Sequence, residues 1–373
     1  MKKKLIAAAA LAAAALPAAH AVDINAGDWT VSVGGNINAF YTHSECKQAA
    51  GTVTGLALGD AALACGGKDK STVIGNGLLP SMLTVGAKTK QGGYDIAAMV
   101  GIGVATATDS AIAQNNVVDV RHAYVTFGNA EMGTIKLGRD YGLFGLNPVL
   151  SDMTLLGVGA ATKATQNGRV SLGHLGAGQV YPGTYGQMAY TTPAMGGFNV
   201  DVALMSPVDA AASAKDSPQF QARATYAGQG FKAWVGAKSQ RFDNPNGFTM
   251  SAAEVGGSMS AGRLGVVATY QAGKGLGILS DGDQGNVKGK NYFVQGTYQV
   301  ADKVKVGLGV GKSRNESGAG AGLQSNENVT AGLYYNLTKS LTLVTEVGQT
   351  KSKAFNGATA KQNSISAGGI FFF

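Results

Sequence analysis

The stretch from Tyr292 to Val310 decides the fold of this 373-residue chain. It reads YFVQGTYQV over 292–300, ADK over 301–303 and VKVGLGV over 304–310. Apolar and aromatic residues recur at alternate positions on both sides of a short break, and most positions between them hold Gln, Thr, Lys or Gly. Successive side chains of a β-strand point to opposite faces. The pattern therefore predicts an antiparallel hairpin with one apolar and one polar face.

The same unit recurs along the whole chain. Sixteen alternating segments can be counted, at 30–41, 83–87, 94–104, 122–126, 133–140, from 185, 198–204, 220–226, 231–237, 253–259, 264–270, 292–300, 304–310, 329–335, 341–347 and 365–373. The short breaks are 91–93, 129–132, 193–197, 228–230, 301–302 and 338–339, and the long ones are 42–76, 106–119, 141–184, 206–217, 274–290 and 314–324. Short turns at one end and long loops at the other are typical of outer-membrane barrels, with the turns in the periplasm.

The first 21 residues form a separate unit. Lys2, Lys3 and Lys4 precede an apolar run over 5–16, and Ala19-His20-Ala21 ends the segment. This layout predicts a cleaved Sec-type signal peptide over 1–21, followed by one barrel domain over 22–373.

Composition agrees with a membrane barrel. The chain contains 56 glycines and only 14% charged residues, and after the signal no apolar run approaches the length of a membrane helix. The formal net charge of +8, about +5 without Lys2, Lys3 and Lys4, is scattered along the chain, which argues against nucleic-acid binding. We predict an all-β, 16-stranded antiparallel transmembrane barrel in the outer membrane, and a soluble β-sandwich is the disfavoured alternative.

One break, 141–184, is far longer than an ordinary connection and shows no sustained helix or strand period. A segment of this length inside a compact domain is usually functional. A barrel of this size has a lumen wide enough to hold it. We therefore predict that 141–184 folds into the lumen and forms the constriction of a pore.

Several motifs resemble those of a known family. RHAYVTF over 121–127 with GTIKLGRDY over 133–141, MAYTTP over 188–193 with GGF over 196–198, and the terminal Phe373 are similar to the β-proteobacterial branch of the general bacterial porins. The resemblance covers the whole mature chain. It implies a homotrimer in outer-membrane lipid that passes small hydrophilic solutes and ions. It also implies that Phe371 and Phe373 belong to a C-terminal signal read by the barrel-assembly machinery.

The resemblance also implies which residues form the constriction. Arg121 and Arg139 are expected on the lumen wall facing the long loop, although Arg139 shares the strand parity of Ile135 and Leu137 and needs a bulge near Gly138 to point inward. The loop itself offers one acid, Asp152, together with Lys163 and Arg169. The sum is positive, which favours weak anion selectivity.

Other predicted sites follow from parity and spacing. Inward parity assigns four further charged residues to the lumen lining: Arg223, Arg263, Lys305 and Glu346. Cys46 and Cys65, both in the first long break, predict one disulfide in an exported protein, and two free thiols are the alternative. Gly35, Ala39, His122 and Thr126 are predicted to point outward and, being small or polar, to lie at a subunit interface.

Catalytic motifs are weak. The run 307–313 ends in Gly-Lys-Ser, but Val306 stands where a P-loop needs its first glycine and no helix follows, so its glycines are interpreted as room for packing. We predict no enzyme activity, cofactor or metal. A general diffusion porin is the favoured function, and a channel selective for one anion or organic acid is the alternative. The alternative requires a dense ladder of basic or aromatic residues in the lumen.

Overall fold

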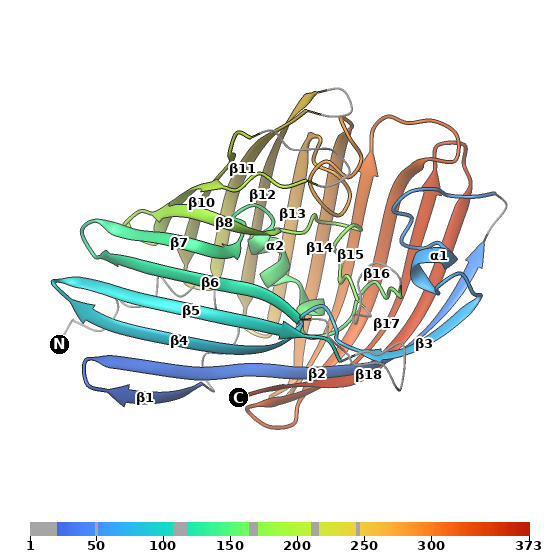
Figure 1. Cartoon of the computed structure of the whole chain (residues 1–373). Coiled ribbons are helices and arrows are strands. Elements are labelled where there is room, and N and C mark those ends of the chain that lie inside the picture. Colours follow the sequence, from blue (N-terminus) through green and yellow to red (C-terminus); the bar gives the residue numbers. More distant parts are fainter. Residues whose placement is uncertain (1–20, 49–50, 107–117, 164–170, 210–215, 244–246) are drawn as a thin grey trace.

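The computed structural model describes residues 21–48, 51–106, 118–163, 171–209, 216–243 and 247–373, so the predicted signal peptide lies outside the described residues except for Ala21. The strands form one continuous ring (Figure 1). Eighteen strands belong to a single sheet, of which sixteen go round the barrel and two, β1 and β3, pair alongside β2. The prediction of a 16-stranded antiparallel barrel is therefore confirmed.

The sixteen barrel strands are β2 Trp29–Gln48, β4 Ser81–Gln91, β5 Tyr94–Val104, β6 Val118–Asn129, β7 Gly133–Tyr141, β8 Thr184–Thr191, β9 Phe198–Met205, β10 Gln219–Gly228, β11 Phe231–Phe242, β12 Phe248–Ala261, β13 Leu264–Lys274, β14 Lys288–Ala301, β15 Val304–Asn315, β16 Leu323–Asn336, β17 Leu341–Ala354 and β18 Thr359–Phe372. The additional strands are β1 Val22–Ala26 and β3 Lys70–Gly75. Three short helical segments complete the described structure, namely α1 Ala61–Ala64, α2 Leu146–Ser151 and the 3₁₀ turn η3 Met153–Leu156.

Pairing of the last strand with the first long strand closes the barrel. β18 runs antiparallel to β2 from the pair Ala360↔Gln48 to the pair Phe372↔Asn36. Beyond the end of β18, Phe373 exchanges two backbone hydrogen bonds with Gly35, of 2.9 and 3.1 Å. Closure removes the open sheet edge that a bilayer does not tolerate.

The two faces of the wall differ as the alternation predicts. Val294, Leu308 and Val347 are 55%, 52% and 52% exposed on the outer face, whereas Asn291 and Gln295 are buried on the inner face. Apolar side chains therefore face outward and amides face inward, the opposite of a soluble protein. A lipid environment favours this arrangement.

The predicted boundaries are wrong at the first strand. β2 continues from Tyr41 to Gln48, and β3 pairs with it from Lys70 to Gly75. The predicted loop over 42–76 includes this extension because its outward positions hold His43, Glu45 and Lys47, which are not apolar. Apolar alternation marks only the part of a strand that crosses lipid, so it does not detect a strand that continues beyond the membrane.

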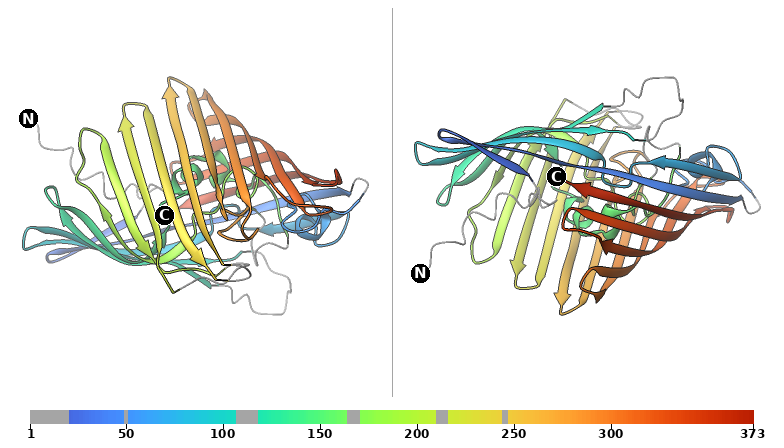
Figure 2. Two further views of the ribbon diagram at one scale, coloured as in Figure 1. Left: turned by 90° about the horizontal axis from the view of Figure 1, so that it is seen from above. Right: turned by 90° about the horizontal axis from the view of Figure 1, so that it is seen from below.

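Among the described residues, no helix is long and apolar enough to cross a membrane. The short helix α2 lies inside the ring of strands (Figures 1 and 2). The inner face of the wall is therefore contacted by the chain's own connections.

Candidate functional site

The connection between β7 and β8 occupies the lumen. We call residues 142–183 loop 3, of which 142–163 and 171–183 are described. It contains α2 and η3, so the expectation of no regular structure is wrong over these two short segments. Several of its apolar side chains, among them Phe144, Val158 and Val180, are at most 1% exposed. Loop 3 therefore packs as a small core of its own against the inner wall.

Polar side chains of the wall bind the backbone of loop 3 along its length. The bonds are Leu143 N and Phe144 N to Gln221 Oε1 (2.8 and 2.9 Å), Gly145 N to Glu254 Oε2 (3.1 Å), Met153 N to Gln295 Oε1 (2.6 Å), Val158 N and Gly159 N to Glu346 Oε2 (both 2.8 Å), Gly178 N to Ser313 Oγ (2.9 Å) and Val180 N to Gln271 Oε1 (3.0 Å). An irregular segment has backbone N–H groups without partners of its own. The inward amides and carboxylates supply those partners.

Glycines of β15 leave room for loop 3 to approach. A Cβ atom at Gly309 would lie 2.8 Å from His174 Cε1, and Cβ atoms at Gly307 and Gly311 would collide with Met153 Sδ and the carbonyl oxygen of Ala177. The interpretation of this glycine run as packing space agrees with these contacts. The run is a groove for loop 3, and its last glycine cannot gain a side chain without displacing backbone.

Two other loops fold inward beside loop 3. In loop 1 (described residues 51–69), Cys65 forms a disulfide with Cys46 of β2, with an S–S distance of 2.01 Å. The carbonyl oxygen of Leu63 in α1 accepts bonds from Lys163 N (2.9 Å) and Thr162 Oγ1 (3.2 Å) of loop 3. Loop 1 thus contacts the described end of loop 3 directly, a contact that no pattern in the sequence predicts.

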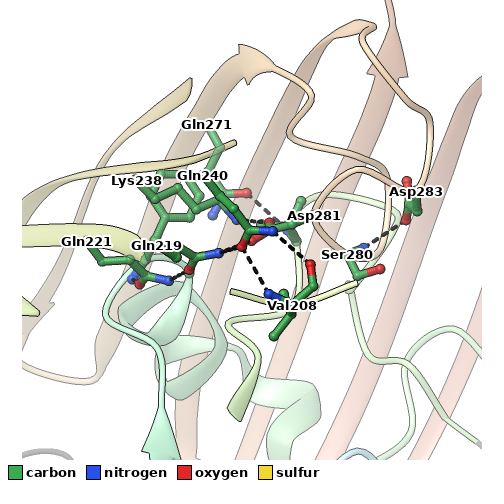
Figure 3. A network of polar contacts seen from close by, with 12 residues as sticks. Val208, Gln219, Gln221, Lys238, Gln240, Gln271, Ser280, Asp281 and Asp283 are labelled. Atoms are coloured by element: carbon green, nitrogen blue, oxygen red, sulfur yellow. Dashed lines mark hydrogen bonds and ion pairs between the residues drawn. The ribbon is translucent and has the colours of Figure 1, made fainter. Parts of the chain in front are cut away.

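Loop 6, residues 275–287, is held by the polar network shown in Figure 3. Asp281 forms a buried ion pair with Lys238 and also accepts a bond of 3.1 Å from Gln219 Nε2. Within the same loop, Asp283 accepts backbone N–H bonds from Ile278, Leu279 and Ser280, each of 2.8 Å. Burial raises the pKa of Asp283 above its ordinary value in spite of these bonds. Loops 1, 3 and 6 together narrow the lumen.

Arg121 lies on the inner wall and contacts loop 3. Its Nη1 donates to Tyr181 Oη of loop 3 at 3.0 Å and to Tyr141 Oη at 3.2 Å, and its Nε contacts Asp119 at 2.6 Å. The side chain is 5% exposed. Arg121 therefore fastens loop 3 to β6, and Asp119 balances its charge.

The same strand has a β-bulge that turns His122 inward. Gly101 pairs with His122 and Ile102 pairs with Val120, so Arg121 is the inserted residue. His122 Nε2 lies 3.6 Å from Asp140 Oδ1. The predicted outward orientation of His122 is wrong, and so is that of Thr126, which pairs with inward Lys136. Counting parity from sequence cannot register an inserted residue.

Arg139 does not point into the lumen. It pairs with Ala123 and Gly186 in unbroken register with Leu137, whose partner Met188 is 64% exposed on the outer face. Its exposed guanidinium donates to the carbonyl oxygen of Val120 at 2.9 Å and to Thr184 Oγ1 at 3.0 Å. The bulge that an inward Arg139 requires is absent from this part of β7. Its assignment to the constriction is therefore corrected.

The charged residues of loop 3 have different surroundings from those expected. Asp152 is 3% exposed and accepts bonds from Thr154 N (2.9 Å), His174 Nδ1 (2.9 Å) and Gln179 Nε2 (3.1 Å). Asp152 organises the loop from within and does not face the water-filled pore, because its partners all belong to loop 3. Lys163 is exposed beside loop 1, and Arg169 lies outside the described residues.

The four predicted lining residues fall into three groups. Arg223 is on the inner wall and forms an ion pair with Asp201 at 2.8 Å, and Lys305 is on the inner wall with its Nζ 5.2 Å from the centre of the Tyr334 ring. Glu346 points inward but is buried under loop 3, so it is not a solvated lining residue. Arg263 lies in the turn between β12 and β13, outside the strands, and is not part of the wall.

Lys232 was missed. It shares the inward parity of Trp234 on β11, and its Nζ donates to Asn147 Oδ1 of α2 at 2.8 Å. Neither Lys232 nor Lys305 has a carboxylate partner among the described residues, whereas Lys136 and Arg223 pair with Asp140 and Asp201. Both unpaired lysines lie next to loop 3: Lys232 through Asn147, and Lys305 two residues before Gly307. They give the partly exposed lumen surface a positive charge.

The described residues contain no cluster of three or more His, Cys, Asp or Glu side chains suited to a metal ion. The arrangement is a transmembrane ring of strands with a polar lumen that is narrowed by inward loops. A closed ring of membrane-crossing strands around a polar lumen is the arrangement of an aqueous pore.

Comparison with known proteins agrees with this class. The family model described as Gram-negative porin matches residues 7–354, so the chain belongs to the Gram-negative porin family. It is accordingly an outer-membrane channel for passive diffusion and not an enzyme. No curated protein sequence matches the chain.

Solved structures show the same fold at low sequence identity. The anion-selective porin from Comamonas acidovorans is 16% identical, with a TM-score of 0.67 over 92% of this chain and 100% of that one. The outer membrane channel DcaP of Acinetobacter baumannii is 15% identical, with a TM-score of 0.67 over 94% and 99%. Salmonella typhi OmpF in complex with daunomycin is 15% identical, with a TM-score of 0.62 over 94% and 100%.

Proposed function

We propose that this porin is a general diffusion channel with a weak preference for anions, set mainly by Lys232 and Lys305. The observation that carries the proposal is that both ammonium groups are on the inner wall beside loop 3 without a carboxylate partner among the described residues. Glu254 and Glu346 do not offset them at the pore surface, because each is covered by loop 3 and accepts its backbone N–H groups. A positively charged lumen favours anions.

Reversal potentials in a KCl gradient across a planar bilayer test this proposal. At 0.15 M salt the Debye length is about 8 Å, so the preference should be clear in dilute KCl and fade near 1 M. The double variant Lys232→Gln/Lys305→Gln should move the reversal potential toward zero. Wild-type cation preference, or an unchanged potential in the double variant, contradicts the proposal.

We further propose that the channel is a homotrimer whose subunits meet through β2 and β4–β6. The supporting observation is that Ala87 and Ala98 lie directly opposite each other on the outer face, with Ala123 on the next strand and Ala39 on β2. Small side chains let two walls approach closely. One solved porin-like structure, OmpT of Vibrio cholerae, is described in a trimer form. Unheated detergent gels should show a species three times the monomer mass that collapses on boiling, and a monomer alone contradicts the proposal.

A further inference from the structure

Two methionines and one histidine gather on the inner wall at three neighbouring strands. Met82 belongs to β4, Met99 to β5 and His122 to β6, and all three share the inner face with Gly101. The point that a Cβ atom at Gly101 would occupy lies 2.5 Å from His122 Nδ1 and 3.0 Å from Met82 Cε, the methyl carbon next to the sulfur. The imidazole and the thioether therefore fill the space that glycine leaves. We call Met82, Met99 and His122 the Met–His cluster.

The Nδ1 atom of His122 points into this cluster. It is buried and has no hydrogen-bond partner among the described residues. Buried polar atoms without a partner are rare and need an explanation. On the other side of the ring, Nε2 lies 3.6 Å from Asp140 Oδ1, which favours the tautomer with its proton on Nε2. Nδ1 then presents a lone pair, and a carboxylate behind the imidazole is the usual arrangement of a metal-binding histidine.

Met99 supplies a second sulfur and the access to the lumen. Its Sδ accepts a weak hydrogen bond from Tyr124 Oη at 3.5 Å, and the ring of Tyr124 lies edge to face with that of His122 at a centroid distance of 6.4 Å. Met99 is partly exposed, whereas Met82 is buried. A methionine side chain has three rotatable bonds, so both sulfurs can turn toward Nδ1.

The donor atoms of the cluster select the kind of ligand. The charges around it are balanced, because Lys136 pairs with Asp140 and Arg121 pairs with Asp119. The cluster itself contains no carboxylate, and hard cations such as Mg²⁺ and Ca²⁺ require oxygen ligands. Thioether sulfur together with imidazole nitrogen suits a soft cation such as Cu(I).

We propose that Met82, Met99 and His122 bind one soft monovalent cation, Cu(I) or Ag(I), on the lumen wall. The three ligands come from three different strands, which is why no spacing motif in the sequence reveals them. The site does not depend on the anion preference of the channel, because its donors are neutral and bind the ion by coordination.

Calorimetric titration of the purified, folded channel with silver nitrate in chloride-free buffer tests the proposal. The cluster variant is Met82→Leu/Met99→Leu, since leucine conserves the volume of methionine. The matched control, Met188→Leu/Met259→Leu, removes two exposed methionines from the outer face. The wild type and the control should bind one Ag⁺ per chain. The affinity of the cluster variant should fall about tenfold or more, because even the loss of an outer partner of a metal ligand costs that much. Equal affinity in all three proteins, or no binding by the wild type, overturns the proposal.

X-ray absorption at the silver edge identifies the ligands of the bound ion. The spectrum of the wild type should contain sulfur together with the multiple-scattering signal of an imidazole ring. His122→Gln should lose the imidazole signal. A spectrum with sulfur alone in the wild type overturns the proposal, because the ion is then held by methionines without His122.

The current through the channel gives a third readout. A bound ion adds one positive charge to the lumen wall, which favours anions. In a dilute KNO₃ gradient, saturating Ag⁺ should therefore move the reversal potential of the wild type and the control toward anions and leave the cluster variant unchanged. The shift is measured against the same channel without Ag⁺, so it is expected whichever ion the unliganded channel prefers. No shift in the wild type, or an equal shift in the cluster variant, overturns the proposal.

Discussion

The backbone N–H of Val158 donates to Glu346 Oε2 at 2.8 Å, and this bond joins loop 3 to the wall strand β17. The neighbouring N–H of Gly159 donates to the same oxygen, also at 2.8 Å. Glu346 Oε1 accepts a bond of 2.6 Å from Tyr334 Oη. One carboxylate therefore holds two backbone groups of the constriction loop and is itself positioned by Tyr334 of the neighbouring strand β16.

Glu346→Ala should loosen loop 3. It leaves two buried N–H groups without an acceptor, which costs about 1–3 kcal/mol for each group. We expect larger single-channel conductance and more current noise, at normal folded yield because the barrel's strand pairing is untouched. Glu346→Gln is the matched control, since its amide oxygen still accepts and it should stay close to the wild type. Identical traces from Glu346→Ala and the wild type would refute this role.

The disulfide predicts a second effect on loop 3. Cys46→Ser/Cys65→Ser releases α1, whose Leu63 carbonyl holds Thr162 and Lys163. In the simple chain-entropy model the disulfide also lowers the conformational entropy of the unfolded chain, which stabilises the folded state by about 3 kcal/mol. We expect faster trypsin cleavage after Lys163 in the intact channel and noisier currents. Cleavage at the wild-type rate would show that loop 3 does not depend on the disulfide.

The fold can be predicted almost completely from the sequence, whereas the constriction can be predicted only in part. Alternation like that of 292–310 marks the face of each strand that meets lipid. Counting the segments that show it along the chain gives the number of strands. It fails where that face leaves the membrane, as in the extension of β2 to Gln48. It also fails at the bulge of Arg121, because an inserted residue reverses every later side chain of the strand without changing composition.

The site was harder to predict because inward charges have two possible environments. Glu346 and Lys305 share inward parity, yet one is buried under loop 3 and the other is partly exposed. Only the path of loop 3 separates them, and that path is irregular. Lys232 could have been found, because it lies two residues before Trp234 on the polar side of an alternating strand. Asp152 was named from the sequence, but its burial could not be predicted, since its partners His174 and Gln179 are far along the loop.

Phe373 should control assembly. Its backbone N–H and C=O bond Gly35, at 3.1 and 2.9 Å, and its ring stacks on Phe371 with centroids 6.2 Å apart. Deleting Phe373 leaves two backbone groups of Gly35 unpaired at the seam where the barrel closes, at a cost of several kcal/mol in lipid. Folded, heat-modifiable protein in outer-membrane fractions should fall sharply. Phe373→Tyr keeps the backbone bonds and an aromatic ring and serves as the control. Normal levels of the deletion variant would exclude this role.

Arg139 gives the sharpest test of which residues face the pore. Its side chain shares the outer face with Leu137 and Met188, and strand pairing is regular on both sides of it. Arg139→Glu changes the charge by two units, but on the far side of the wall from the water-filled path. We therefore expect its reversal potential in dilute KCl to equal that of the wild type. Lys305→Glu makes the same change of charge on the inner wall, beside Tyr334, and should shift the potential toward cations. A shift in Arg139→Glu as large as that in Lys305→Glu would mean that Arg139 reaches the lumen and that the register of β7 is not the one described.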